Sequence, residues 1–97
     1  MTDREGGAMT LEKGLAAFLD AMLGKNRSQA TLRAYKTDIL QFITYLRQNN
    51  VAIAAAADVG KVDILEYLAV LARKGLTGVA RARKVSAIRE YFRFLEL

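Results

Sequence analysis

Residues 29–49 read QATLRAYKTDILQFITYLRQN, and this stretch decides the fold. Its apolar side chains recur every three or four positions, which is the spacing of one face of an α-helix. They cover a sector of about 100° around the helix axis, and they are Leu32, Tyr35, Ile39, Phe42, Ile43 and Leu46. The opposite side is polar, apart from Leu40, and it carries Arg33, Lys36, Thr37, Thr44 and Arg47. The pattern predicts a long amphipathic helix with one face against a core.

The ends of this helix are marked by residues of the expected kinds. Ser28 precedes it and is a good N-cap, because its hydroxyl can accept a hydrogen bond from a backbone N–H of the first turn. Asn49 and Asn50 can adopt the left-handed conformation that ends a helix. The chain contains no proline, so breaks must come from glycine, asparagine and capping residues.

A shorter helix is predicted before it, over residues 10–23, with Thr10 as N-cap and Gly24 as the left-handed stop. Its apolar face consists of Leu11, Leu15, Phe18, Leu19 and Met22. Residues 1–9 are predicted to form a flexible tail. Residues 50–60 are predicted to form a loop, in which the alanine-rich part could hold a short helical turn.

A third helix is predicted to begin near Lys61, after Gly60 or Asp58, and to end at Gly75. Asp63 lies in its first turn, where a carboxylate suits the helix dipole. Its expected buried side consists of Val62, Leu65, Leu68, Ala69 and Ala72.

The fourth helix is predicted to start after Thr77, its N-cap, and to end near Leu95. Its expected core stripe consists of Val85, Ile88, Phe92 and Leu95. No segment alternates polar and apolar residues over a strand length, so no sheet is expected. The sequence therefore predicts an all-α domain over residues 10–97, a compact four-helix bundle.

The composition points away from catalysis. The 97 residues include no cysteine and no histidine, which removes thiolate chemistry, the usual proton-transfer side chain and the commonest metal ligand. We expect no catalytic residues, no metal site and no cofactor. Tyr35 and Tyr91 fall on or beside apolar stripes and are interpreted as core residues with the hydroxyl at the edge. Asp38 is interpreted as a local ion-pair partner or a surface group.

No apolar run is long enough to cross a membrane, and the polar N-terminus lacks the apolar region of a secretory signal. The expected location is the cytoplasm.

Charge is unevenly distributed along the chain. Residues 1–24 hold two basic and four acidic side chains, a net −2, and since the whole chain carries +5, residues 25–97 carry +7. Such an excess fits a polyanionic partner, although solubility alone could also explain it.

The basic residues form two groups. The first surrounds the start of the long helix and, with two hydroxyl residues, consists of Lys25, Arg27, Ser28, Thr31, Arg33 and Lys36. The second lies in the fourth helix and consists of Arg81, Arg83, Lys84, Arg89 and Arg93. Lysine and arginine neutralise phosphates, and arginine can also bind guanine in the major groove. The second group does not form one stripe along the helix, because Arg81 points in the same direction as Val85 and Arg83 points nearly the opposite way. The alternative interpretation is that these residues are ordinary charged side chains on the solvent-exposed surface of a helix.

Three motifs resemble the N-terminal core-binding domain of tyrosine recombinases, the phage integrase family. The first is Ser28-x-x-Thr31-x-x-x-Tyr35-x-x-Asp38-Ile39-x-x-Phe42-x-x-x-Leu46. The second is Val62-Asp63-Ile64-x-x-Tyr67-Leu68-x-x-Leu71. The third is Gly75-Leu76-Thr77 followed by Arg83-Lys84-Val85-Ser86-Ala87-Ile88-Arg89-x-x-Phe92-x-x-Leu95. Their order and spacing cover about residues 10–97.

The resemblance implies a SAM-like bundle that binds double-stranded DNA at a recombination half-site, with its second and fourth helices facing the major groove. It implies a separate C-terminal catalytic domain in the full-length protein, so this part is expected to be non-catalytic, and monomeric when isolated. By matching position, the best DNA contacts are Thr31, Arg33, Arg83 and Lys84, supported at the backbone by Lys25, Arg27, Ser28 and Lys36. Two positions depart from the family pattern: Ala80 replaces a frequent threonine and Arg81 replaces an apolar residue.

Two other functions fit the same residues. A helical protein-interaction module could present its basic faces to an acidic partner protein. A helix-turn-helix transcription regulator would need a short turn near residues 24–28 and a recognition helix read at its start.

Overall fold

The computed structural model describes residues 10–49 and 58–95. These residues form four helices: α1 (Leu11–Gly24), α2 (Gln29–Asn49), α3 (Lys61–Arg73) and α4 (Gly78–Leu95). The described part of the chain contains no strand, which confirms the all-α prediction. The predicted tail and the alanine-rich part of the predicted loop lie outside the described residues. No helix in the described ranges is both long and apolar enough to traverse a lipid bilayer.

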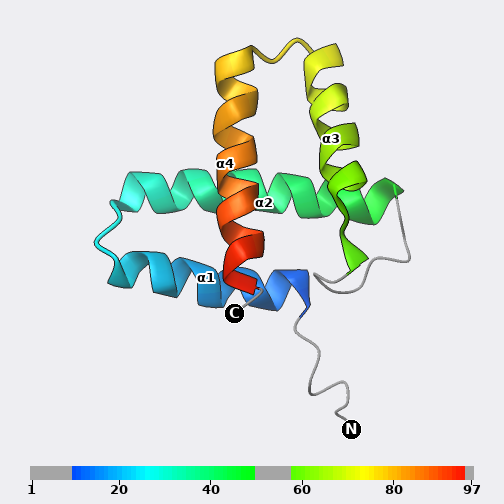
Figure 1. Ribbon diagram of the computed structural model, residues 1–97. Coiled ribbons are helices and arrows are strands. Elements are labelled where there is room, and N and C mark those ends of the chain that lie inside the picture. Colours follow the sequence, from blue (N-terminus) through cyan, green and yellow to red (C-terminus); the bar gives the residue numbers. More distant parts are fainter. Residues whose placement is uncertain (1–9, 50–57, 96–97) are drawn as a thin grey trace, which may run out of the picture.

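The helices are arranged as two antiparallel pairs, α1 with α2 and α3 with α4 (Figure 1). The second pair lies across the first, and α4 passes over α2 and reaches α1 with its last turns. The first half of α4 therefore projects beyond α2 on the side away from α1 (Figure 1). Both α2 and α4 pack against all three other helices, so the residues of these two helices determine how the pairs meet.

The helix starts are capped where the sequence predicted. The hydroxyls of Thr10, Ser28 and Thr77 each accept a hydrogen bond, at 3.1 Å, from the backbone N–H three residues later. At the start of α3, the Gly60 N–H donates to Asp63 Oδ2 at 2.7 Å. These bonds satisfy donors that the first turn of a helix leaves free.

The predicted stop at Gly75 is confirmed, because this glycine has a φ of 91°. The predicted stop at Gly24 is wrong. The backbone N–H groups of Lys25 and Asn26 still bond to carbonyls of Met22 and Leu23, so the helical turn continues through Gly24. Asn26 makes the reversal instead, with a φ of 63°, a conformation that asparagine tolerates better than most residues.

The core is rich in aromatic side chains. Phe18 of α1 packs against Tyr91 at 5.4 Å and Tyr35 at 6.0 Å between ring centroids. Phe42 of α2 packs against Tyr67 at 5.0 Å. The predicted apolar stripe of α2 is confirmed, since five of its six residues are buried and the sixth, Tyr35, is half-buried.

The far ends of α1 and α2 are joined by an exposed ion pair. Arg47 Nη2 lies 2.6 Å from Glu12 Oε1, and this hydrogen bond holds the pKa of the Glu12 carboxyl below its usual value. The pair aligns the start of α1 with the last turn of α2.

The buried side predicted for α3 is wrong. Val62 is 64% exposed and Leu65 55% exposed, whereas Tyr67 and Leu71 are buried. The helix has apolar residues on two sides, and the side with the aromatic ring faces the core. Tyr67 lies against both Phe42 and Tyr45 of α2, and a ring buries more apolar surface than a valine or a leucine.

The core stripe predicted for α4 is partly wrong. Ile88 is buried, but the other predicted residues, Val85, Phe92 and Leu95, are only half-buried. The helix is rotated so that Lys84, Ala87 and Tyr91 lie inside with Ile88. Both polar tips have partners: the Tyr91 hydroxyl donates to the Leu11 carbonyl, and the Lys84 ammonium is paired as described below.

Candidate nucleic-acid interface

Asp38 lies at the crossing of α2 and α4 and is only 1% exposed. Its Oδ1 accepts hydrogen bonds from Lys84 Nζ at 2.8 Å and from Arg83 Nη2 at 3.3 Å. Arg83 Nη1 lies 3.2 Å from Asp38 Oδ2. The interpretation of Asp38 as a surface group or a local ion-pair partner is therefore wrong, because its cations come from a helix about 45 positions away.

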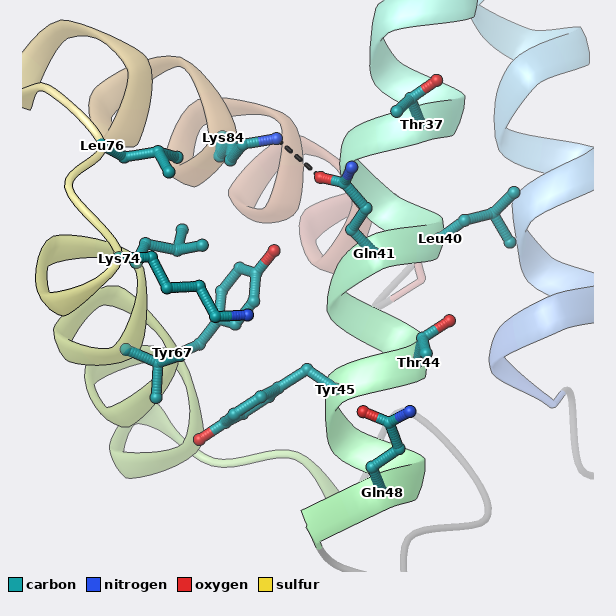
Figure 2. Close-up of a pocket in the computed structure, with 12 residues that line it drawn as sticks. Thr37, Leu40, Gln41, Thr44, Tyr45, Gln48, Tyr67, Lys74, Leu76 and Lys84 are labelled. Atoms are coloured by element: carbon teal, nitrogen blue, oxygen red, sulfur yellow. Dashed lines mark hydrogen bonds between the residues drawn. The ribbon is translucent and has the colours of Figure 1, made fainter.

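Lys84 is 8% exposed, so it is not a surface cation. Besides Asp38, its ammonium binds Gln41 Oε1 at 2.7 Å, the contact drawn dashed in Figure 2. An ammonium has three N–H donors, and two are committed to α2. Contrary to its place among the expected DNA contacts, the structure gives Lys84 the role of joining α4 to α2.

Arg27 joins the turn between α1 and α2 to α4. Its Nη1 donates to the Tyr35 hydroxyl at 3.0 Å, and its Nη2 lies 3.2 Å from Glu90 Oε1. The Tyr35 hydroxyl in turn donates to Glu90 Oε2 at 2.6 Å. The bond to Glu90, with burial, raises the pKa of Tyr35, because both favour the neutral phenol. The sequence analysis assigned no role to Glu90, because only the packing of α4 brings it to Arg27.

Arg81 is also engaged within the fold. Its Nη1 donates to the Leu76 carbonyl at 2.7 Å, so the guanidinium turns back over the joint between α3 and α4. This explains how an arginine occupies a position where the family pattern has an apolar residue: its charged end bonds to a carbonyl while its stem covers the turn. Arg81, which was expected to contact DNA, therefore has a partner within the domain, the Leu76 carbonyl.

Several of the other candidates remain at the surface: Lys25, Ser28, Arg33, Lys36 and Arg89 are exposed, and Thr31 is half-buried. Ser28 Oγ bonds to Thr31 Oγ1 at 2.9 Å, so both hydroxyls lie at the first turn of α2. Arg83 keeps a side chain that is 53% exposed despite its contact with Asp38. The exposed cations of α2 are concentrated in its first half and in the turn before it.

Arg33 and the Asp38 contact lie on different sides of α2. Arg33 precedes Asp38 by about 7.5 Å along α2 and about 140° around it, with Thr37 and Gln41 at intermediate angles. Arg83 contacts Asp38, and Lys84 contacts both Asp38 and Gln41, so α4 lies against the Asp38 side of α2. We use the name basic corner for three exposed residues of the two crossing helices, Arg33 and Thr37 of α2 and Arg83 of α4.

Beyond the basic corner, a groove of about 740 Å³ lies between the second half of α2 and the α3–α4 joint. Tyr67 and Lys74 reach across it toward α2, which contributes neutral polar side chains such as Gln41, Thr44 and Gln48 (Figure 2). None of the residues that line the groove is acidic. An anionic ligand on the basic corner would therefore meet no repelling carboxylate in this groove.

Within residues 10–49 and 58–95, no cluster of three or more histidine, cysteine or acidic side chains could hold a metal ion. The described cations and hydroxyls can bind anions.

Four helices in two crossed pairs, with cations on the second and fourth, define a small SAM-like helical domain. Residues 8–97 match the family described as the phage integrase N-terminal SAM-like domain, and the chain belongs to this family.

Similar curated proteins are tyrosine recombinases. The chain is 32% identical over 90 residues to a tyrosine recombinase of Pseudothermotoga lettingae, covering 90% of this chain and 30% of that protein. It is 34% identical to the tyrosine recombinase XerD of Shewanella oneidensis, covering 81% of this chain and 26% of the relative. It is 37% identical to XerC of Listeria welshimeri, covering 73% and 23%. The chain thus spans less than a third of the curated relatives it matches, and no solved structure gave a significant match.

Proposed function

We propose that this chain is the DNA-binding domain of a site-specific tyrosine recombinase and that it binds a recombination half-site through the major groove during DNA integration or recombination. The observation that carries the proposal is the Asp38 contact, which holds the exposed Arg83 of α4 against α2, the helix whose first half carries Arg33 and Lys36. Two basic helices that meet at one place can contact one stretch of duplex together.

The exposed residues divide into two kinds of contact. Lys25 and Lys36 supply charge for phosphates, and the hydroxyls of Ser28 and Thr31 at the start of α2 supply neutral phosphate contacts. Arg33 and Arg83 have guanidinium groups that can neutralise phosphates on any duplex and can also bind base edges in the major groove at a specific site. Arg89 is exposed on the outer side of α4 and adds to the positive field.

Strand cutting and rejoining would belong to a C-terminal catalytic domain of the full-length recombinase. The relatives are about three to four times longer than the part they share with this chain, which leaves room for such a domain in them. In isolation, the domain would be a monomer, and we expect it in the cytoplasm. In the full-length protein, it would hold the half-site while the catalytic domain cuts and rejoins the strands.

The test is titration of a fluorescent random-sequence 20-base-pair duplex, followed by anisotropy at several salt concentrations. If about four phosphates are neutralised, the plot of log affinity against log salt should have a slope of about −3.6. Arg33→Gln should weaken binding several-fold and make the slope shallower by about 0.9.

Arg73→Gln is the matched control, because Arg73 is an exposed arginine at the end of α3 and its replacement changes the net charge by the same amount. Equal effects of the two variants would mean that the contact is general charge attraction rather than the basic corner. Failure of the wild-type domain to bind duplex would overturn the proposal and favour a protein partner.

A further inference from the structure

We propose that Asp38 is a positioning residue for sequence-specific DNA recognition. Its carboxylate binds one edge of the Arg83 guanidinium and thereby orients a second edge of that group toward a guanine. This inference rests on the proposed DNA-binding function and assigns a role to an acidic residue that no positive-charge argument would select.

The grip uses both terminal nitrogens of Arg83. Nη2 donates to Asp38 Oδ1 at 3.3 Å and Nη1 lies 3.2 Å from Oδ2. A guanidinium has five N–H donors in one plane. With Nη2 bonded to Oδ1 and Nη1 beside Oδ2, the Nε hydrogen and the outer Nη2 hydrogen remain on a separate edge. That edge matches the paired acceptors O6 and N7 of guanine.

The carboxylate is itself held in place. Lys84 binds Oδ1 from inside the crossing, and Gln41 fixes Lys84 from the other side. Asp38 is buried, whereas the Arg83 side chain is 53% exposed. The charged anchor is therefore rigid, and the group that it aims remains accessible to a ligand.

Asp38 can also accept a second hydrogen bond from Arg83. Its Oδ2 is buried and accepts no hydrogen bond from any described residue. A small shift of the guanidinium would convert the 3.2 Å contact with Nη1 into a hydrogen bond and complete a two-bond fork. Because Arg83 would be ordered before DNA arrives, less side-chain freedom would be lost on binding.

Charge attraction alone makes the opposite prediction for this residue. Removing a carboxylate next to DNA phosphates should strengthen binding to every sequence. The positioning role predicts instead that selectivity falls even though non-specific affinity is unchanged or higher. The two effects can be separated by measuring preference and affinity independently.

The experiment selects bound duplexes from a randomised 20-base-pair library with the 97-residue wild-type chain and determines the preferred sequence. The same selection is repeated with Asp38→Asn, Asp38→Glu and Arg83→Gln. Asn retains an oxygen for Lys84, and Glu keeps the charge but moves the carboxylate by one methylene. All three should lose about tenfold of the discrimination at one common guanine position.

Glu66→Gln is the matched control, since Glu66 is an exposed carboxylate on α3, and it should keep the full preference. Circular dichroism identifies any variant that fails to fold. If one of the two Asp38 variants is unfolded, the sequence preference of the other one tests the positioning role. Full preference in a folded Asp38 variant would overturn the positioning role. So would a wild-type chain that binds duplexes without enriching any sequence, whereas a wild-type chain that binds no duplex at all would overturn the proposed function itself.

Discussion

The Lys84 ammonium lies 2.8 Å from the Asp38 carboxylate although the two residues are 46 positions apart, and both are buried where α4 crosses α2. Removing two charges from water costs free energy, which their attraction and the added bonds to Gln41 and Arg83 offset. The crossing of the two helix pairs is thus specified by charge as well as by apolar contact.

Asp38→Ala should strongly destabilise the domain. It would leave the Lys84 ammonium buried without its counter-charge, and breaking such a pair lowers the free energy of unfolding by about 3–5 kcal/mol. Urea denaturation followed by circular dichroism measures the loss. Glu66→Ala, which removes an exposed carboxylate, should change stability by no more than about 0.5 kcal/mol. A loss below about 1 kcal/mol for Asp38→Ala would argue against the pair described here.

Tyr35→Phe should lower the free energy of unfolding by about 1 kcal/mol, because it removes the hydroxyl that joins Arg27 to Glu90. Tyr45→Phe is the control: Tyr45 is also half-buried, and its hydroxyl makes no hydrogen bond to a described residue. Thermal unfolding of the two variants side by side provides the comparison. Equal shifts in Tm would mean that the Arg27–Tyr35–Glu90 network adds nothing to stability.

Two leucines on α3 test which side of this helix is buried. Leu71→Ala should cost about 2–5 kcal/mol, as expected for a buried leucine. Leu65→Ala should cost no more than about 0.5 kcal/mol, because Leu65 is largely exposed. Chemical denaturation of both variants measures the difference. The reverse ranking would restore the side that periodicity predicted.

Alkaline pH should weaken the fold through Tyr91. Burial raises the pKa of the Tyr91 phenol from 10.0 to about 12, and burial raises the pKa of Tyr67 as well. Because the folded state holds the phenol proton more tightly than the unfolded chain, this stabilisation is complete below pH 10 and is lost as the pH rises to about 12.

The measurement is the urea midpoint as a function of pH, together with the phenolate absorbance. Tyr91→Phe should be less stable at neutral pH, since it loses the bond to the Leu11 carbonyl, but its stability should depend less on pH in the alkaline range. An unchanged alkaline profile in this variant would assign the effect to other tyrosines.

Sequence periodicity predicted α1 and α2 well because each has one apolar face and a capping hydroxyl before it. It was less successful for α3, where Val62 and Leu65 compete with Tyr67 for the inner side. For α4 the error has a different origin. Lys84 was counted among the surface cations because of its charge, yet its ammonium reaches a buried acceptor within the fold, whereas Tyr91 was correctly expected in the core.

The candidate interface was harder to predict than the helices. Composition identified the cations, but it could not show which of them have partners inside the domain. Arg27 is paired with Glu90, 63 positions later, and Lys84 with Asp38, and only the packing of α4 brings these groups together. Which residues contact DNA therefore stays a prediction, now focused on the basic corner.

The bond from Tyr91 to the Leu11 carbonyl has a consequence for synthesis. These residues are 80 positions apart, so the first and last described helices close the core together. A ribosome makes the chain from its N-terminus, and α1 and α2 must wait with exposed aromatic faces until α4 has emerged. Truncation within α4 would leave those faces open to aggregation, so this domain should complete its folding only after α4 has emerged.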